Sequence, residues 1–223
     1  KYEQDFVAKA KAAAGDATDT LPEDLKTLYS TLNIDNTKLK ESDIDFAGAS
    51  DTKRSLSLKG PSDIGKTISD MTIKYGGQEY YISLKNKQGS GIYSGASVPW
   101  IYEKDGKVIY DPSKLDPSSG NGLIFDIFSI NSDRLADGLN KYVNQIGESE
   151  VWETDKIDTQ KFKNLLASSL GFGYYYVREY GKGDVKVIPL LTPQDALDAV
   201  GDIKNASIKY PSKDAKQVTI KVD

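Results

Sequence analysis

The chain has 223 residues, of which 38% are hydrophobic and 28% charged, and its formal net charge is −4. This composition is typical of a folded globular protein and excludes an intrinsically disordered chain. The sequence contains neither cysteine nor histidine, which excludes disulfides, thiolate nucleophiles, cysteine-bound zinc and histidine general bases. Any catalysis therefore depends on Asp, Glu, Lys, Ser, Thr or Tyr, and any metal is expected to be a hard ion such as Mg²⁺ or Mn²⁺.

Two helices are predicted at the start of the chain. Segment 1–15 is alanine-rich and ends at a glycine, and segment 20–33 carries leucines at helical spacing with Pro22 in its first turn. Residues 33–52 are polar and irregular. Three alternating segments then predict strands at 54–59, 71–75 and 78–85.

The second and third of these strands flank Gly76-Gly77, which predicts a β-hairpin. The remaining elements are predicted, in chain order, as a strand pair around Asp105-Gly106, helices at 132–146 and 158–170, strands at 173–180 and 184–191, a short helix at 192–200, and a closing hairpin from 206–210 and 217–222. Helices, three strands, helices and further strands favour an α+β or mixed α/β fold. No linker interrupts the pattern, so a single domain over 1–223 is expected.

Residues 60–67, GPSDIGKT, match the G-x-x-x-x-G-K-T pattern of a phosphate-binding P-loop. Under this interpretation the phosphate-binding residues are Gly65, Lys66 and Thr67, and Asp126 is a second metal contact. A P-loop joins a buried strand to a long helix, whereas the preceding segment is half polar and the sequence alternates like a strand from Asp70 onward. We therefore expect a turn, with a P-loop NTPase as an alternative function.

Asp70 and Lys85 are candidate catalytic residues, because the predicted hairpin brings its two ends together. Asp70 precedes the first hairpin strand, and Ser83-Leu84-Lys85 ends the second. Alternation places Ser83 and Lys85 on one face of that strand. A carboxylate beside a lysine suits phosphodiester cleavage, in which the acid holds Mg²⁺ or Mn²⁺ and the lysine orients a water or the phosphate.

This pattern resembles the core of the PD-(D/E)XK nuclease superfamily, which includes restriction endonucleases and phage nucleases. The resemblance implies an αβββαβ core with a mixed sheet, in which Asp70 is the first acid and metal ligand and Lys85 is the lysine. It implies a helical N-terminal part at 1–52, a nuclease-like core at 53–180 and a β-rich extension at 181–223. It also implies Mg²⁺ or Mn²⁺ as cofactor, DNA as partner, and a cytoplasmic location, which is the host cytoplasm if the protein is phage-encoded.

The chain departs from the family pattern at Ser83, which occupies the position of the second acid. Glu79 lies on the same face but roughly 13 Å away at about 3.3 Å per residue. Glu23, Asp24 and Asp63 are alternative sources of the acid. The missing acid leaves open a non-catalytic phage structural or DNA-binding protein on the same scaffold.

The segment around the hairpin is basic within an acidic chain. Residues 53–90 carry 7 basic and 3 acidic groups, whereas residues 1–52 carry 6 and 11. Such a segment suits either a polyanion or a solvated strand face. Gln88 and Ser90, which follow the lysine, are candidate substrate-binding residues. No membrane partner is expected, and the alternatives for assembly are a homodimer and a complex with other phage or host proteins.

Overall fold

The computed structural model describes residues 1–47, 56–86, 96–97, 101–105, 107–111, 113, 120–129, 149–152, 156–181, 183–209 and 217–222. The chain forms two compact units. Unit 1 comprises Lys1–Arg54, Ser62–Ser90 and Gly171–Ala196, and unit 2 comprises Ser55–Pro61, Gly91–Leu170 and Leu197–Asp223. The single domain over 1–223, with its internal boundaries, stays a prediction.

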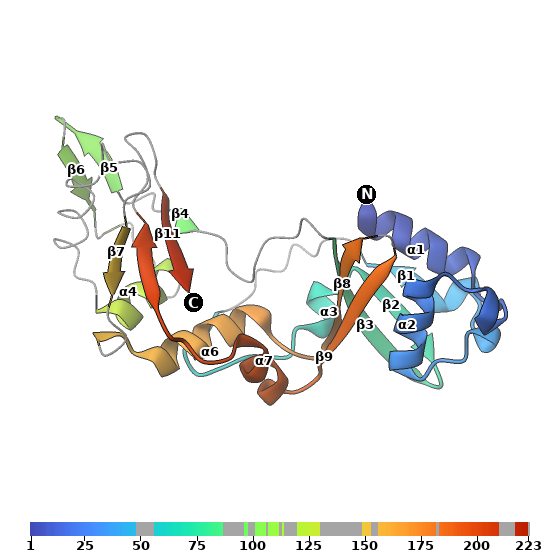
Figure 1. The fold of residues 1–223 in the computed structure, drawn as a ribbon. Helices are drawn as coiled ribbons and strands as arrows, with labels where there is room; N and C mark the ends of the chain where they lie inside the picture. The colour runs from blue at the N-terminus through green and yellow to red at the C-terminus, as the bar shows by residue number, and fades with distance from the viewer. Residues whose placement is uncertain are drawn as a thin grey trace. The chain divides into compact units, whose positions relative to one another are not determined.

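Unit 1 is built on a five-stranded mixed sheet with the order β1-β2-β3-β8-β9 (Figure 1). The strands are β1 (Ile44–Phe46), β2 (Met71–Tyr75), β3 (Gln78–Lys85), β8 (Tyr174–Gly181) and β9 (Asp184–Leu190). β3 and β8 are parallel, and the other neighbours are antiparallel. The expected α+β class is confirmed. The last strand, β9, lies in this sheet although it belongs to the segment expected as a C-terminal extension.

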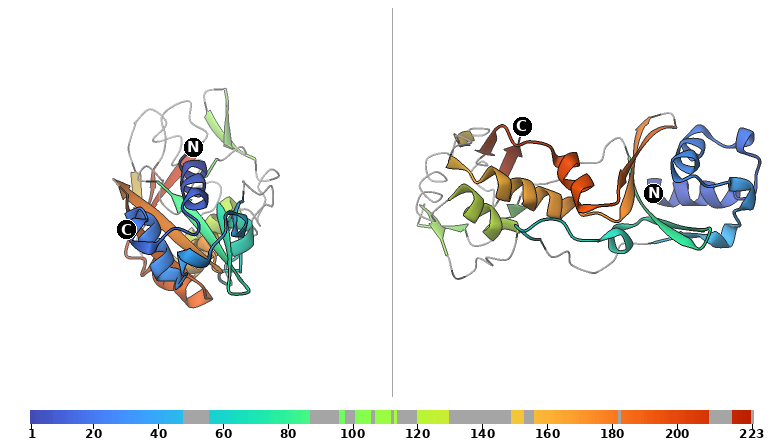
Figure 2. Two further views of the ribbon diagram at one scale, coloured as in Figure 1. Left: turned by 90° about the vertical axis from the view of Figure 1, so that its right-hand side faces the viewer. Right: turned by 90° about the horizontal axis from the view of Figure 1, so that it is seen from below.

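One face of this sheet is covered by the N-terminal helices α1 (Tyr2–Ala12) and α2 (Glu23–Leu32), which Figures 1 and 2 show in blue. Three short 3₁₀ helices, Thr18–Thr20, Asn36–Lys38 and Glu41–Asp43, accompany them. The leucines of α2 pack with Ile82 and Leu84 of β3 and Val177 of β8 in the core of unit 1. We call this side of the sheet the helical face.

The hairpin of β2 and β3 is confirmed and fixes which side chains share a face. Gly76 and Gly77 both have positive φ, at 60° and 78°, a conformation that glycine adopts without steric cost. Met71 pairs with Ile82, and Ile73 with Tyr80. Because side chains alternate along a strand, Tyr81, Ser83 and Lys85 lie on the side opposite the helical face, which we call the second face.

The strand predicted at 54–59 is wrong for its described part, since residues 56–59 form no strand. Their backbone is bound instead by side chains of α6 (Thr159–Leu170) within unit 2. The Ser57 N–H donates to Ser168 Oγ at 2.9 Å, and Asn164 Nδ2 donates to the Leu58 carbonyl at 2.9 Å. The first strand is β1, in the segment expected to be irregular, where Ile44 is fully buried and pairs with Ile73.

Unit 2 contains a four-stranded antiparallel sheet with the order β4-β11-β10-β7. Its strands are β4 (Ala96–Ser97), β7 (Ser149–Trp152), β10 (Ala206–Lys209) and β11 (Gln217–Val222). A separate hairpin joins β5 (Ile101–Lys104) to β6 (Lys107–Tyr110). The predicted hairpins here and at the C-terminus are both confirmed.

Helices complete unit 2. In α4 (Gly120–Phe128) and α6 the rings of Phe128 and Phe162 lie 5.3 Å apart at an angle of 67°. The predicted helix at 158–170 is confirmed as α6. The one at 192–200 is confirmed as α7 (Pro193–Val200), which begins in unit 1 and ends in unit 2. The predicted helix at 132–146 lies outside the described residues.

Candidate functional site

The site begins with the position of Asp70, one residue before β2. The Asp70 N–H donates to the Ile82 carbonyl at 2.8 Å, which extends the β2–β3 ladder by one residue. In an antiparallel hairpin the start of one strand lies beside the end of the other. The local pairing therefore brings the Asp70 carboxylate to the last residues of β3.

Asp70 Oδ2 accepts three hydrogen bonds from consecutive residues of β3. The donors are Ser83 Oγ at 3.2 Å, the Leu84 N–H at 2.7 Å and Lys85 Nζ at 3.2 Å. Ser83 is fully buried, while the side chains of Asp70 and Lys85 are 19% and 36% exposed. The structure thus brings together the three residues that the sequence pattern singles out, and their catalytic role stays a prediction.

Only one of the two carboxylate oxygens of Asp70 accepts hydrogen bonds from described residues. All hydrogen bonds recorded to it in the described part of the chain go to Oδ2. In proteins, Mg²⁺ is bound through one or two carboxylates together with water and substrate phosphate. Within the described ranges no cluster of three or more acidic, histidine or cysteine side chains could hold a metal ion. Asp70 therefore fits a divalent ion only as a single carboxylate ligand.

Two of the three proposed replacements for the second acid are held elsewhere. Asp24 is buried and forms an ion pair with Lys9 of α1, and Glu23 pairs with Lys26 at 3.8 Å. Both acids belong to α2, which packs on the helical face, whereas Ser83 faces the opposite side of the sheet. The expectation that α2 could supply the second acid is therefore wrong.

Glu79 and Asp63 lie near the second face of the hairpin, the face that carries Ser83 and Lys85. Glu79 accepts a hydrogen bond from the Tyr81 hydroxyl at 2.5 Å, which raises the pKa of Tyr81, and the charge of Asp63 adds to this effect. Asp63 also accepts a hydrogen bond from the Gly65 N–H at 3.1 Å. Asp63 is thus the one alternative acid whose charge reaches the second face of β3.

Residues 60–67 do not have the setting of a P-loop. Residues 56–62 form no strand, and the following helix α3 (Gly65–Ile68) has only four residues before β2 begins. Lys66 is exposed and Thr67 half-buried. Asp126, expected as a second metal contact, lies in α4 of unit 2 and accepts a hydrogen bond from Lys161 Nζ at 3.1 Å. Gly65, Lys66 and Thr67 therefore lack the strand and long helix that hold phosphates in a P-loop.

The glycine of this motif has a structural explanation instead. A Cβ at position 65 would lie 1.9 Å from the Gly173 carbonyl oxygen. The same backbone contact includes hydrogen bonds between Ile64 and Phe172 at 3.0 Å and between Phe172 and Ser62 at 3.2 Å. The turn 60–67 thus holds the start of β8 against the segment that leads into the site.

Two residues of β8 lie next to the site, and one of them, Arg178, was not singled out from the sequence. In the parallel pairing of β3 with β8, Ser83 is opposite Tyr176 and Lys85 is opposite Arg178. The alternation in YYYVREY predicts which of its residues share a face, but the pairing with β3 joins residues about ninety positions apart. Gln88 and Ser90, the predicted substrate-binding residues, lie outside the described residues.

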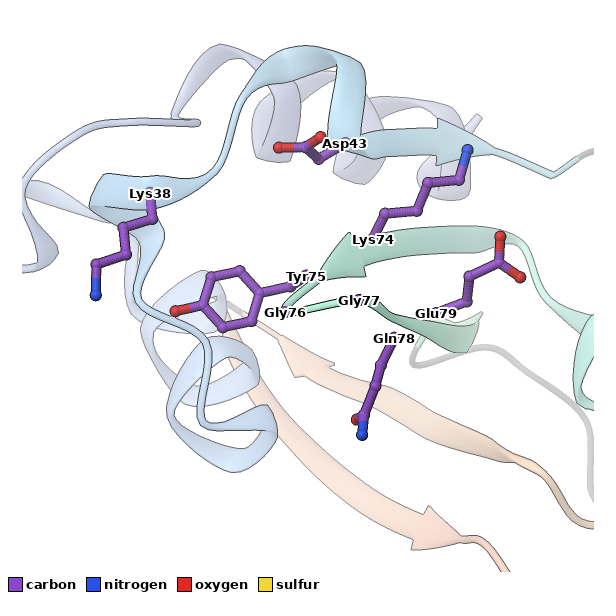
Figure 3. A pocket seen from close by; sticks show the side chains of 8 residues that line it. All are labelled: Lys38, Asp43, Lys74, Tyr75, Gly76, Gly77, Gln78 and Glu79. Atoms are coloured by element: carbon purple, nitrogen blue, oxygen red, sulfur yellow. The ribbon is translucent and has the colours of Figure 1, made fainter.

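A separate hollow of about 690 Å³ lies at the turn of the hairpin, at the end away from Asp70 (Figure 3). It is lined by Lys38, Asp43, Lys74, Tyr75, Gly76, Gly77, Gln78 and Glu79. Its two lysines are already paired, Lys38 with Asp35 at 3.1 Å and Lys74 with Asp45 at 2.8 Å. These pairs neutralise the cations that could attract an anion there.

Comparison with known proteins identifies no relative of the chain. No protein-family model matches the chain, and neither the curated proteins nor the solved structures contain a significant match. The described part of the chain also has no helix with the length and apolar character needed to cross a membrane. The interpretation of the site therefore rests on its geometry.

Proposed function

We propose that the protein hydrolyses phosphodiester bonds of DNA with the help of a divalent metal ion, at a site formed by Asp70, Ser83 and Lys85. The observation that carries this proposal is the convergence of Ser83, Leu84 and Lys85 on a single oxygen of Asp70, with distances of 2.7 to 3.2 Å. It joins an acid and a lysine from two adjacent strands in the manner expected from the resemblance to PD-(D/E)XK nucleases.

The order of elements supports the same proposal. Helix α2, strands β1, β2 and β3 in neighbouring positions, and strand β8 beside β3 are compatible with the αβββαβ order. The segment 132–146, expected to supply the second helix, lies outside the described residues. The first strand is β1 rather than 54–59, which shortens the distance along the chain from α2 to the sheet.

Each residue has a distinct task under this proposal. Ser83 Oγ and the Leu84 N–H fix the Asp70 carboxylate through Oδ2, so that Oδ1 can serve as the metal ligand. A bound Mg²⁺ or Mn²⁺ supplies an activated water and neutralises charge on the scissile phosphate. Lys85, whose ammonium has three donors, binds Asp70 with one of them and can donate another to the attacking water or to a phosphate oxygen.

The proposal is tested by incubating the protein with supercoiled plasmid in Mg²⁺, in Mn²⁺ and in EDTA. We expect metal-dependent nicking that falls at least about 100-fold in Lys85→Ala and Asp70→Asn, the scale on which removing one transition-state donor acts. Lys74→Ala is the matched control, because Lys74 also projects from the hairpin but is paired with Asp45 at the far end. Nicking that survives in both site variants would contradict the proposal.

A non-catalytic DNA-binding or phage structural protein is the second candidate, and one observation favours it. The position at which the resemblance implies a second acid holds a fully buried serine that donates to Asp70, so this position offers no carboxylate to a metal ion and forms a structural hydrogen bond instead. In this case the plasmid would stay intact in every metal, while DNA binding would be the same in the wild-type protein and in Asp70→Asn.

A further inference from the structure

Lys85 is the first of three basic residues that lie side by side across the sheet. Lys85 of β3 is opposite Arg178 of β8, and Arg178 is opposite Lys186 of β9. Residues that face each other in adjacent strands project on the same side of a sheet. On the helical face, Leu84, Val177 and Val187 are the corresponding neighbours. The basic row of Lys85, Arg178 and Lys186 therefore lies on the second face, next to Asp70.

Among the described residues, the positive charge of this row is compensated by an ion pair only at Lys85. Lys85 is paired with Asp70 at 3.2 Å, whereas no ion pair with a described residue is recorded for Arg178 or Lys186. Glu179 belongs to the helical face, since it is opposite Val185 and its charge acts on Tyr2 of α1. Asp184 lies two residues before Lys186 and is exposed, without an ion pair to it.

Like charges directly opposite each other on a sheet are destabilising. A bound anion would relieve the repulsion between Arg178 and Lys186. Arg178 is half-buried, and its guanidinium carbon lies 5.6 Å from the centre of the Tyr180 ring. A guanidinium held against an aromatic ring loses less conformational freedom when it binds phosphate.

We propose that Arg178 and Lys186 bind the phosphate backbone of the nucleic acid strand whose phosphodiester enters the site at Asp70. Adjacent strands are about 4.8 Å apart, so the row extends over about 10 Å. This matches the axial rise of about three nucleotides of a DNA strand, at about 3.4 Å each. The inference rests on the proposed function for the direction in which the nucleic acid strand runs toward Asp70. Binding of the phosphate backbone by Arg178 and Lys186 requires no catalytic step. Arg178 and Lys186 are positioning residues.

The experiment is a fluorescence anisotropy titration of a labelled DNA duplex and of the single strand, in EDTA and in Ca²⁺, over a series of salt concentrations. The variants are Arg178→Gln, Lys186→Gln and the double variant. Each lost phosphate contact is expected to raise Kd by about threefold to tenfold and to lower the slope of log K against log salt by about one, with a change of about two in the double variant. Arg178→Lys, which keeps the charge, should keep the slope.

Lys74→Gln is the matched control, since Lys74 is a lysine on the second face of the same sheet but forms an ion pair with Asp45. It should leave Kd and the salt slope unchanged. Thermal unfolding of each variant shows whether it is folded, and removing like charges is not expected to lower its melting temperature. Inorganic phosphate and poly-glutamate serve as competitors that distinguish a phosphate strand from a free phosphate ion and from an acidic protein.

Loss of affinity and slope in Arg178→Gln and Lys186→Gln, with Lys74→Gln unchanged, supports the inference. Wild-type affinity in the double variant overturns it, and so does a wild-type protein that binds neither DNA form. Displacement by poly-glutamate as readily as by unlabelled DNA of equal charge also overturns it. Failure of the proposed function alone gives a different result. A protein that binds DNA through Arg178 but never nicks plasmid supports this inference and contradicts the proposed catalysis.

Discussion

Lys85 Nζ and Asp70 Oδ2 lie 3.2 Å apart although the two residues are fifteen positions apart in sequence. The contact is produced by the hairpin, whose register puts the residue before β2 beside the end of β3. The same carboxylate binds the backbone of Leu84 at 2.7 Å. Asp70 therefore connects two strands and contacts the ammonium group of Lys85.

Because Asp70 accepts three hydrogen bonds, its loss should lower stability as well as activity. Asp70→Ala leaves the Leu84 N–H and the buried Ser83 hydroxyl without their acceptor, which should cost about 1–3 kcal/mol of the free energy of unfolding. Asp70→Asn keeps an acceptor oxygen and should cost less. Urea unfolding followed by circular dichroism measures both. Equal midpoints for Asp70→Ala and the wild type would show that these hydrogen bonds contribute nothing.

Ser83→Asp tests whether the site can hold a metal. The substitution puts a second carboxylate into a fully buried position beside Asp70, and two like charges in a buried site repel each other. We expect a lower melting temperature in EDTA and a larger increase on adding Mn²⁺ than in the wild type. Ser83→Asn is similar in size but uncharged and should not respond to metal. An identical response of the Asp and Asn variants would argue against a metal at this position.

Gly65→Ala distinguishes two explanations of the glycine in GPSDIGKT. If Gly65 were an ordinary helical residue, alanine would stabilise the protein by about 1 kcal/mol through helix propensity. Contact of the new Cβ with the Gly173 carbonyl, at 1.9 Å, predicts destabilisation by about 1–3 kcal/mol instead. Thermal unfolding decides the sign, with the exposed neighbour variant Lys66→Ala expected to be close to neutral.

The raised pKa of Tyr29 predicts that the protein loses stability at alkaline pH. Burial, with the charge of Asp24 adding to it, raises the pKa of Tyr29 to about 12 from 10.0. The folded state thus favours the neutral phenol, so the resulting stability is complete below pH 10 and is lost as pH rises through about 12. The hydroxyl is buried without a partner among the described residues. Tyr29→Phe should unfold at higher pH than the wild type while keeping its stability at neutral pH.

This prediction is checked by urea unfolding at several pH values from about 9 to 12, with the free energy of unfolding plotted against pH. Tyr180→Phe is the control, since that ring is 47% exposed and its loss should not shift the curve. A Tyr29→Phe curve that follows the wild type throughout would show that another group governs the alkaline transition.

The candidate site could be predicted because its signals are local. Alternation on both sides of Gly76-Gly77 is enough to set the hairpin register, and the register brings Asp70 to Lys85. β1 could not be predicted in this way, because three residues are too few for a periodic pattern and Ile44 gains its burial from Ile73. The alternation at 54–59 predicted a strand that residues 56–59 do not form, because side chains of α6, more than a hundred positions away, bind the backbone of Ser57 and Leu58.

The basic row could not be predicted from the sequence. Nothing near Lys85 in the sequence indicates that Arg178 and Lys186 are its neighbours. Their pairing arises from the parallel contact of β3 with β8, which depends on long-range packing rather than on a turn. Residues on one hairpin can thus be assigned together from sequence, and residues on strands that meet only in the fold cannot.

The division of the chain into two units has a consequence for how the protein folds. The six segments Lys1–Arg54, Ser55–Pro61, Ser62–Ser90, Gly91–Leu170, Gly171–Ala196 and Leu197–Asp223 alternate between the units, so the backbone passes from one to the other five times. Pairing β3 with β8 closes a loop that contains most of unit 2, and such long-range closure slows folding. Neither unit can be excised as one continuous fragment, so synthesis must reach β8 and β9 before the sheet beside Asp70 can be completed.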